Sequence, residues 1–199
     1  MVRARSSLRV DYLQQFPKLM HPFIIHTKDV QSDGNCGYRV IANMLGFGED
    51  GWAQVRRDML IELNAFPHLY EGVYGSSERL EEIRHALNHF DGGAAYDKWM
   101  VMPDMGYLIS SHYNVVLFLL SRPECLTFLP LRTEPLPVAA RRYITVGFIN
   151  NNHFIEASLF LYKFRISYSI WNISYHFSGL LCLYAVTLKQ WTSSAPYPI

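Results

Sequence analysis

The sequence has 199 residues, of which 50% are hydrophobic and 18% are charged, and its formal net charge is +1 at pH 7. This length and composition predict one globular domain with a full hydrophobic core, because domains typically hold about 100–200 residues. A net charge near zero argues against nucleic acid as a partner, since binding to phosphates needs clustered Lys and Arg. We therefore expect the partner to be a protein or a small molecule.

Three cysteines, Cys36, Cys125 and Cys182, are scattered along the chain. An odd number without a CxxC pair indicates reduced thiols, which are typical of a cytoplasmic or nuclear protein. His85 and His89 have a spacing that allows joint metal binding, but acidic residues surround them and a solvated helix face is the better interpretation. We expect neither a metal nor a cofactor.

The first elements lie between residues 1 and 63. Residues 1–27 lack the apolar run of a secretory signal and are expected to be a poorly ordered leader. Turn residues fill 28–35, and a helix is predicted from Cys36 to Leu45, with Gly46 at its C-terminal cap. A second, amphipathic helix is predicted over 49–63, with Pro67 beyond its end.

Two further helices are predicted in the middle of the chain. One starts after Gly75 with Ser76 or Ser77 as its N-cap, ends at Gly92-Gly93 and buries one face. The residues of that face are Leu80, Ile83, Leu87 and Phe90. The other starts around Pro103, which suits a first helical turn. It is expected to bury Met105, Leu108 and Ile109.

Strands follow the helices. Apolar runs predict strands at 115–120, 127–131 and 144–150, and a turn at Asn151-Asn152 leads into another strand that opens at His153. Helices first and strands afterwards predict an α+β fold. Residues 161–199 form an atypical hydrophobic and aromatic tail of uncertain status, and polar interruptions at Asn172 and His176 make a membrane-spanning helix unlikely.

The chemistry lies in two short segments, Asp33-Gly34-Asn35-Cys36 and, 117 residues later (153 − 36), His153. A thiolate is favoured at a helix N-terminus and beside a histidine, and the predicted fold could give a cysteine both. Backbone N–H groups of the glycine-containing turn could also stabilise an oxyanion. Each residue has a plain alternative: a cysteine in an apolar helix is usually buried filler, and a lone histidine before Phe is usually structural.

The segment DGNCGYR resembles the nucleophile motif of the ovarian-tumour (OTU) family of cysteine proteases, in which Asp-Gly-x-Cys precedes an aromatic residue and Arg. The helices that follow, and the segment GFINNNHFI, are also similar to OTU domains, especially those found beside plant and fungal transposable elements. The resemblance covers about residues 28–160. It implies a papain-like OTU fold with a small central β-sheet packed between helical layers.

The resemblance also implies site residues and a reaction. Cys36 would be the nucleophile, His153 the general base and then acid, and Asp33 the motif aspartate. Gly34 and Asn35 would belong to the oxyanion loop. The reaction would be hydrolysis of isopeptide bonds in ubiquitin or ubiquitin-like conjugates, which makes ubiquitin the expected partner.

The third member of the triad departs from the family pattern. Many relatives have Asp or Asn two residues after the histidine, where this chain has Ile155, which cannot orient an imidazole. Asn150, Asn151, Asn152 or Asp33 could substitute for it. The departure keeps an alternative open, a catalytically inactive OTU-like module that binds ubiquitin or serves as a scaffold. A non-functional remnant of a mobile element is a third interpretation.

Overall fold

The strands of the computed structural model, which describes residues 12–134 and 136–160, form one mixed sheet in the order β1-β5-β4-β2-β3. The central pair, β2 and β4, is parallel, and every other neighbouring pair is antiparallel. The strands are β1 (Ile24–Lys28), β2 (Val115–Leu120), β3 (Leu126–Phe128), β4 (Arg142–Ile149) and β5 (His153–Leu159). The sheet thus joins the beginning of the described chain to its end, because β1 pairs with β5.

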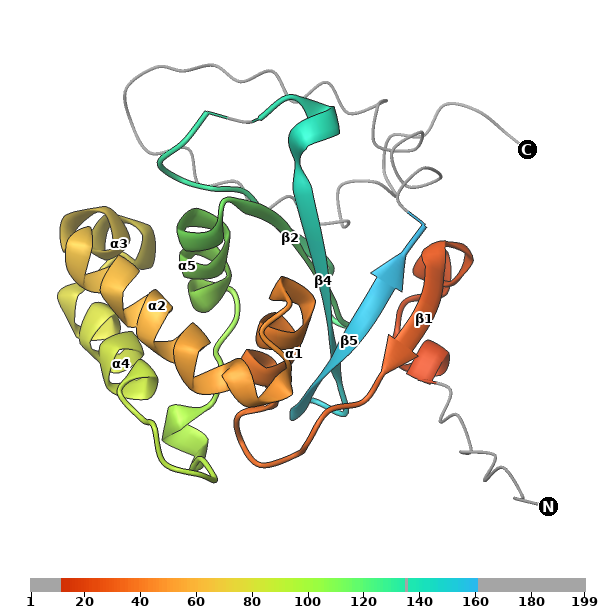
Figure 1. Ribbon diagram of the computed structural model, residues 1–199, viewed down its shortest axis with the longest axis horizontal. Coiled ribbons are helices and arrows are strands. Elements are labelled where there is room, and N and C mark those ends of the chain that lie inside the picture. The colour runs from red at the N-terminus through yellow and green to blue at the C-terminus, as the bar shows by residue number, and fades with distance from the viewer. Residues whose placement is uncertain (1–11, 135, 161–199) are drawn as a thin grey trace.

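The α-helices gather on one side of this sheet (Figure 1). They are α1 (Cys36–Leu45), α2 (Trp52–Ala65), α3 (Pro67–Tyr74), α4 (Ser77–Leu87) and α5 (Asp104–Tyr113). Short 3-10 turns add η1 (Tyr12–Gln15), η2 (Lys18–Phe23), η3 (Glu49–Gly51), η4 (Tyr96–Lys98) and η5 (Val138–Ala140). Helices α1 and α5 pack directly against the sheet, α1 on β4 and β5 and α5 on β2 and β3, and α2 packs against both of these helices.

The predicted helix over 36–45 is confirmed, including its cap. Gly46 has φ +91°, a left-handed conformation that glycine adopts without steric cost, and its N–H bonds to the end of the helix. The second predicted helix is also present as η3 and α2, and Pro67 lies beyond its end as predicted. The sequence did not predict α3, in which Pro67 occupies the first turn, where its missing N–H is harmless.

The predictions for α4 and α5 are confirmed with one correction. Ser76 caps α4 by accepting a hydrogen bond from the Arg79 N–H at 3.1 Å, and α5 begins directly after Pro103. However, α4 ends at Leu87, well before the two glycines, and Phe90 lies outside the helix with 40% of its surface exposed. The chain turns at Asn88, so the apolar periodicity past that point no longer describes a helix face.

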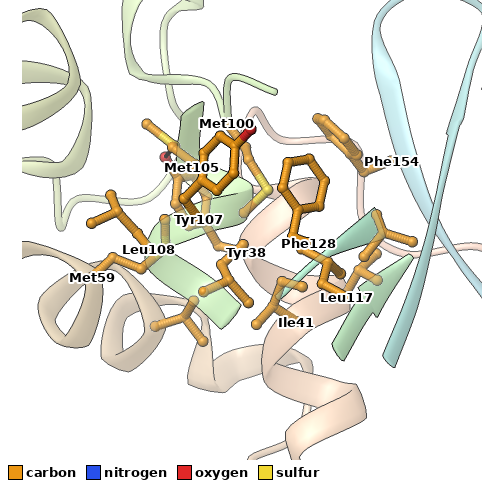
Figure 2. Packing of buried hydrophobic residues seen from close by; sticks show 14 of the residues in the cluster. Tyr38, Ile41, Met59, Met100, Met105, Tyr107, Leu108, Leu117, Phe128 and Phe154 are labelled. Carbon is orange, nitrogen blue, oxygen red and sulfur yellow. Dashed lines mark hydrogen bonds between the residues drawn. The ribbon is translucent and has the colours of Figure 1, made fainter. Parts of the chain in front are cut away.

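Strand β2 explains why the run VVLFLL is apolar throughout. Its six residues are all buried because alternate side chains enter two different hydrophobic cores. Val115, Leu117 and Leu119 face the larger core beneath the helices. Figure 2 shows Tyr38 and Ile41 of α1 in that core together with Leu117, and Phe154 lies at its edge.

The second core lies on the opposite face of the sheet, and the N-terminal segment covers it. Phe16 and Met20 are each only 2% exposed and pack with Phe118, Ile155 and other residues of this face. Residues 12–27 are therefore part of the folded unit, in contrast to the leader expected for 1–27. The expected α+β arrangement of a sheet between helical layers is confirmed: α-helices cover one face, and the 3-10 helices η1 and η2 cover the other.

The strands predicted at 115–120 and 144–150 and the turn before His153 are confirmed, but the strand expected at 127–131 is shorter: β3 ends at Phe128, and Pro130, which has no N–H to donate, follows it. Asn150 and Asn151 have φ +52° and +56°, and the Asn152 N–H closes the turn onto the Ile149 carbonyl at 3.1 Å. Asparagine tolerates this left-handed conformation better than most residues, which is why the sequence could indicate the turn. Residues 1–11 of the expected leader and the tail 161–199 lie outside the described residues.

Candidate active site

Cys36 is the first residue of α1, so its side chain lies at the positive end of the helix dipole. The backbone N–H of Phe154, on β5, donates a hydrogen bond to the Cys36 sulfur at 3.5 Å. Only 6% of the surface of Cys36 is exposed. The sulfur is therefore held between the helix tip and the start of β5, with restricted access from solvent.

The loop before Cys36 is fixed by side-chain and backbone hydrogen bonds. Asp33 accepts a hydrogen bond from the Asn35 N–H at 2.9 Å and pairs with both Nε and Nη2 of Arg39, at 3.2 and 2.7 Å. Burial raises the pKa of the Asp33 carboxyl, and the bonds from Arg39 and Asn35 lower it by more, so its net shift is downward. Asp33 is thus an ionised anchor for the loop.

Gly34 is required by the backbone at this loop. It has φ +81°, and a Cβ atom placed on it would lie 2.2 Å from the carbonyl oxygen of Ala94. The Ala94 N–H in turn donates to the Asp33 carbonyl at 2.8 Å. The segment around Ala94, which leads to η4, therefore packs closely against the loop. Any side chain at Gly34 would force the two segments apart.

His153 is the first residue of β5, and Asp29 and Ser32 lie next to its imidazole ring. Its Nε2 lies 2.7 Å from Oδ1 of Asp29, and its Nδ1 lies 3.2 Å from the Ser32 hydroxyl. The pKa of His153 is raised to about 8 by a hydrogen bond with the Cys36 side chain, an effect that burial opposes and that Asp29 reinforces. At pH 7 the arrangement therefore favours the protonated form of the His153 imidazole, beside the Asp29 carboxylate.

Asp29 follows β1 directly, and it reaches His153 because β1 pairs with β5. Its carboxylate also accepts from the Tyr12 hydroxyl at 2.7 Å and from the Val30 N–H at 2.9 Å. Burial raises the pKa of Asp29, and the bonds from His153 and Tyr12 lower it by more. The Tyr12 pKa rises to about 12 for the converse reason, because its proton is held by the carboxylate.

No model of a known protein family and no curated protein matches the sequence. Among solved structures, the viral OTU domain protease from Qalyub virus is similar, with a TM-score of 0.52 and 12% identity over 69% of this chain and 85% of that chain. This chain has the OTU fold. The OTU of Hazara virus, solved bound to ubiquitin, has a TM-score of 0.48 and 11% identity, covering 70% of this chain and 84% of that one. The OTU domain of OTUD1 has a TM-score of 0.44 and 17% identity, covering 66% and 84%.

The three asparagines that were candidates for orienting His153 do not contact its ring nitrogens in this OTU fold. Asn150, Asn151 and Asn152 form the exposed turn before β5, where they shape the backbone that leads to His153. Asp29 and Ser32, and not these asparagines, lie within hydrogen-bond distance of the imidazole nitrogens. Ile155, the departure from the family pattern, is fully buried in the second core.

Sequence reasoning missed Asp29 and Ser32. Both lie near the boundary that the sequence suggested between leader and domain, and the contact between Asp29 and His153 spans 124 residues. A signal was present: residues 24–27 contain Ile24, Ile25 and Thr27, which favour a strand, followed by polar residues suited to a strand end. A strand predicted there would have placed Asp29 directly after the end of a strand, where side chains from different strands can meet.

Residues 12–134 and 136–160 contain no group of three or more His, Cys, Asp or Glu side chains suited to holding a metal ion. His85, a metal candidate by spacing, lies 2.9 Å from Asp97 instead, and His89 bonds to the Gly93 carbonyl. No helix in these ranges has the length and apolar character needed to cross a membrane. The association with transposable elements stays a prediction.

Proposed function

We propose that this chain is a thiol isopeptidase that cleaves ubiquitin or ubiquitin-like conjugates. The observation that carries the proposal is the convergence of three segments: Asp29 lies 2.7 Å from Nε2 of His153, and Cys36 accepts a hydrogen bond from the N–H of Phe154, the residue next to His153. The order of the groups is that of a nucleophile, a base and an orienting residue, which defines this chemistry by geometry and not by position in the sequence.

The geometry supports a two-step acyl transfer. His153 accepts the Cys36 proton, and the thiolate attacks the isopeptide carbonyl carbon, whose oxygen becomes an oxyanion. The backbone N–H of Cys36 and its loop can stabilise that oxyanion. His153 then donates the proton to the departing lysine amine, which leaves a thioester on Cys36. Water, deprotonated by His153, attacks the thioester and releases the carboxylate and the thiol.

The substrate class follows from access to the sulfur and from the OTU-like motif. Cys36 is 6% exposed and lies beside Phe154, which is buried. A nucleophile enclosed in this way favours an acyl group whose last residues have no side chains. The C-terminal tail of ubiquitin, which ends in glycines, meets that condition.

Labelling with a ubiquitin whose C-terminus bears a thiol-reactive electrophile tests the proposal. We expect a covalent adduct with the full chain, detected as a gain of the mass of one ubiquitin, and its loss in Cys36→Ala. Cys125→Ala is the matched control, because Cys125 is buried in the second core and donates to the Ser121 carbonyl. We expect this control variant to be labelled at the normal rate.

Three results would count against the proposed function. A folded chain that forms no adduct, yet binds ubiquitin, would favour the inactive binding module. An adduct that persists in Cys36→Ala would place the reactive thiol elsewhere and remove Cys36 from the mechanism. The absence of a cooperative thermal melt would favour the third interpretation, a remnant that does not fold.

A further inference from the structure

Arg56 of α2 is the largest side chain that is completely buried, with an exposed fraction of 0%. Its guanidinium lies 3.8 Å from the centre of the Tyr38 ring. It donates two hydrogen bonds to Asn35 Oδ1, at 3.1 and 2.7 Å, and further bonds to the carbonyls of Ala86 and Lys98, at 2.7 and 2.8 Å. All of these acceptors are neutral groups.

The charge of Arg56 is thus buried without an ion pair in the part of the chain that the structure describes. Other buried or half-buried arginines have carboxylate partners: Arg39 has Asp33, and Arg132 has Glu62. Arginine stays protonated in proteins, so the positive charge is present. An unpaired buried charge is costly, and a fold retains one where it serves another group.

Asn35 connects this charge to the nucleophile. It is 0% exposed, immediately precedes Cys36 and occupies the N-cap position of α1, but its side chain makes no capping hydrogen bond. Its Oδ1 is taken by Arg56, and its Nδ2 has no hydrogen-bond partner among the described residues. The side chain that would ordinarily cap the helix is instead held by the guanidinium, directly behind the loop that carries Cys36.

We propose that Arg56 is a positioning residue for Cys36: its fork fixes Asn35 and the oxyanion loop, and its unpaired charge stabilises negative charge on the sulfur. The inference rests on the proposed role of Cys36 as a nucleophile. It adds a second source of positive potential, from the core side, to the imidazolium of His153 on the sheet side. The charged or titratable groups around Cys36 are His153 and Asp29 at the sheet, Asp33 and Arg39 at the loop, and Tyr38 and Arg56 below the helix.

The pH dependence of alkylation by iodoacetamide tests the charge without any substrate. Peptide-resolved mass spectrometry follows Cys36 separately from Cys125 and Cys182. In Arg56→Met we expect the midpoint of the rate profile to rise by about one pH unit, which slows alkylation about tenfold below the midpoint. Arg57→Met is the matched control, because Arg57 is the exposed neighbour that packs over Phe90. We expect its profile to coincide with that of the wild type.

Asn35→Asp tests the role of the Arg56 charge in a second way. Aspartate has the shape of asparagine and would give Arg56 the carboxylate partner that it lacks. We expect the variant to melt at or above the temperature of the wild-type chain, while its alkylation midpoint also rises by about one pH unit. The new carboxylate also acts on the sulfur directly, so a raised midpoint in Asn35→Asp supports the inference only together with a raised midpoint in Arg56→Met.

The alkylation experiments can fail independently of the ubiquitin-labelling experiment that tests the proposed function. If Arg56→Met does not fold, Arg56→Gln takes its place, because glutamine is uncharged but keeps a polar group that can bond to Asn35. An unmoved alkylation midpoint in a folded Asn35→Asp, or in a folded Arg56→Met, would overturn the inference. If the midpoints rise as expected but the wild-type chain never reacts with the ubiquitin electrophile, the isopeptidase proposal fails while the role of Arg56 stands.

Discussion

The carboxylate of Asp29 lies against the His153 imidazole, a place for which the sequence had suggested Asn150, Asn151, Asn152 or Asp33. It lies 2.7 Å from Nε2 on the side of the ring away from Nδ1, and its charge helps to raise the His153 pKa to about 8, after the larger effect of Cys36. The raised value means that the folded chain binds this proton more tightly than the unfolded chain. The stability gained from it is complete below about pH 6.5 and is lost as the pH rises through about 8.

Asp29→Asn is expected to reduce turnover of a fluorogenic ubiquitin substrate by about ten- to a thousandfold, because the imidazole loses its orienting charge. The alkaline limb of the pH–rate profile should move to lower pH, since the imidazolium then loses its proton earlier. Asp97→Asn removes a carboxylate from the exposed His85 in the same way and should change neither quantity. An unchanged alkaline limb in Asp29→Asn would show that Asp29 does not act on His153.

At the scale of elements, the sequence predicted the helices and turns whose ends are determined by neighbouring residues. The Ser76 cap, the Gly46 stop and the turn at Asn151 each act within a few residues, so α1, α4 and the hairpin to β5 could be located. The segment of η1, η2 and β1 was missed, although residues 24–27 favour a strand, because its burial depends on a sheet face supplied by residues 116–120 and 155–159. The same dependence hid Asp29, which only the pairing of β1 with β5 brings to the site.

That N-terminal segment gives a test at the same scale. Phe16 is 2% exposed and fills the space over Gly147, where an added Cβ would lie 2.6 Å from its ring. Phe16→Ala is expected to lower the free energy of unfolding by about 3–5 kcal/mol, as loss of a buried aromatic side chain usually does. Leu19→Ala is the control from the same segment, because Leu19 is 46% exposed and should cost less than about 1 kcal/mol. Equal small losses in chemical denaturation would mean that the segment does not seal the second core.

At the scale of the whole molecule, Glu62 ties distant parts of the helical layer together. It lies on α2, is 3% exposed at its side chain, and bonds to Tyr70 of α3 and to Arg132 beyond β3, with His112 of α5 at 3.7 Å. Burial raises the pKa of Glu62, but these partners lower it by more, to about 2. A carboxyl whose folded pKa is depressed contributes stability above its unfolded pKa, near 4.5, and loses it as the pH falls toward 2.

Glu62→Gln therefore has an expected effect that depends on pH in a fixed direction. At pH 7 the variant should be less stable than the wild type by about 3 kcal/mol, the free energy that corresponds to a shift of this size. The difference should shrink as the pH falls from about 4.5 toward 2, because the wild-type carboxyl is then protonated and resembles the amide. Glu81→Gln, which removes only an exposed partner of Arg84, should differ from the wild type by less than about 0.5 kcal/mol at every pH. Denaturant melts at several pH values measure both, and a Glu62→Gln difference that stays constant between pH 7 and pH 2.5 would mean that packing, and not the charge of Glu62, joins these helices.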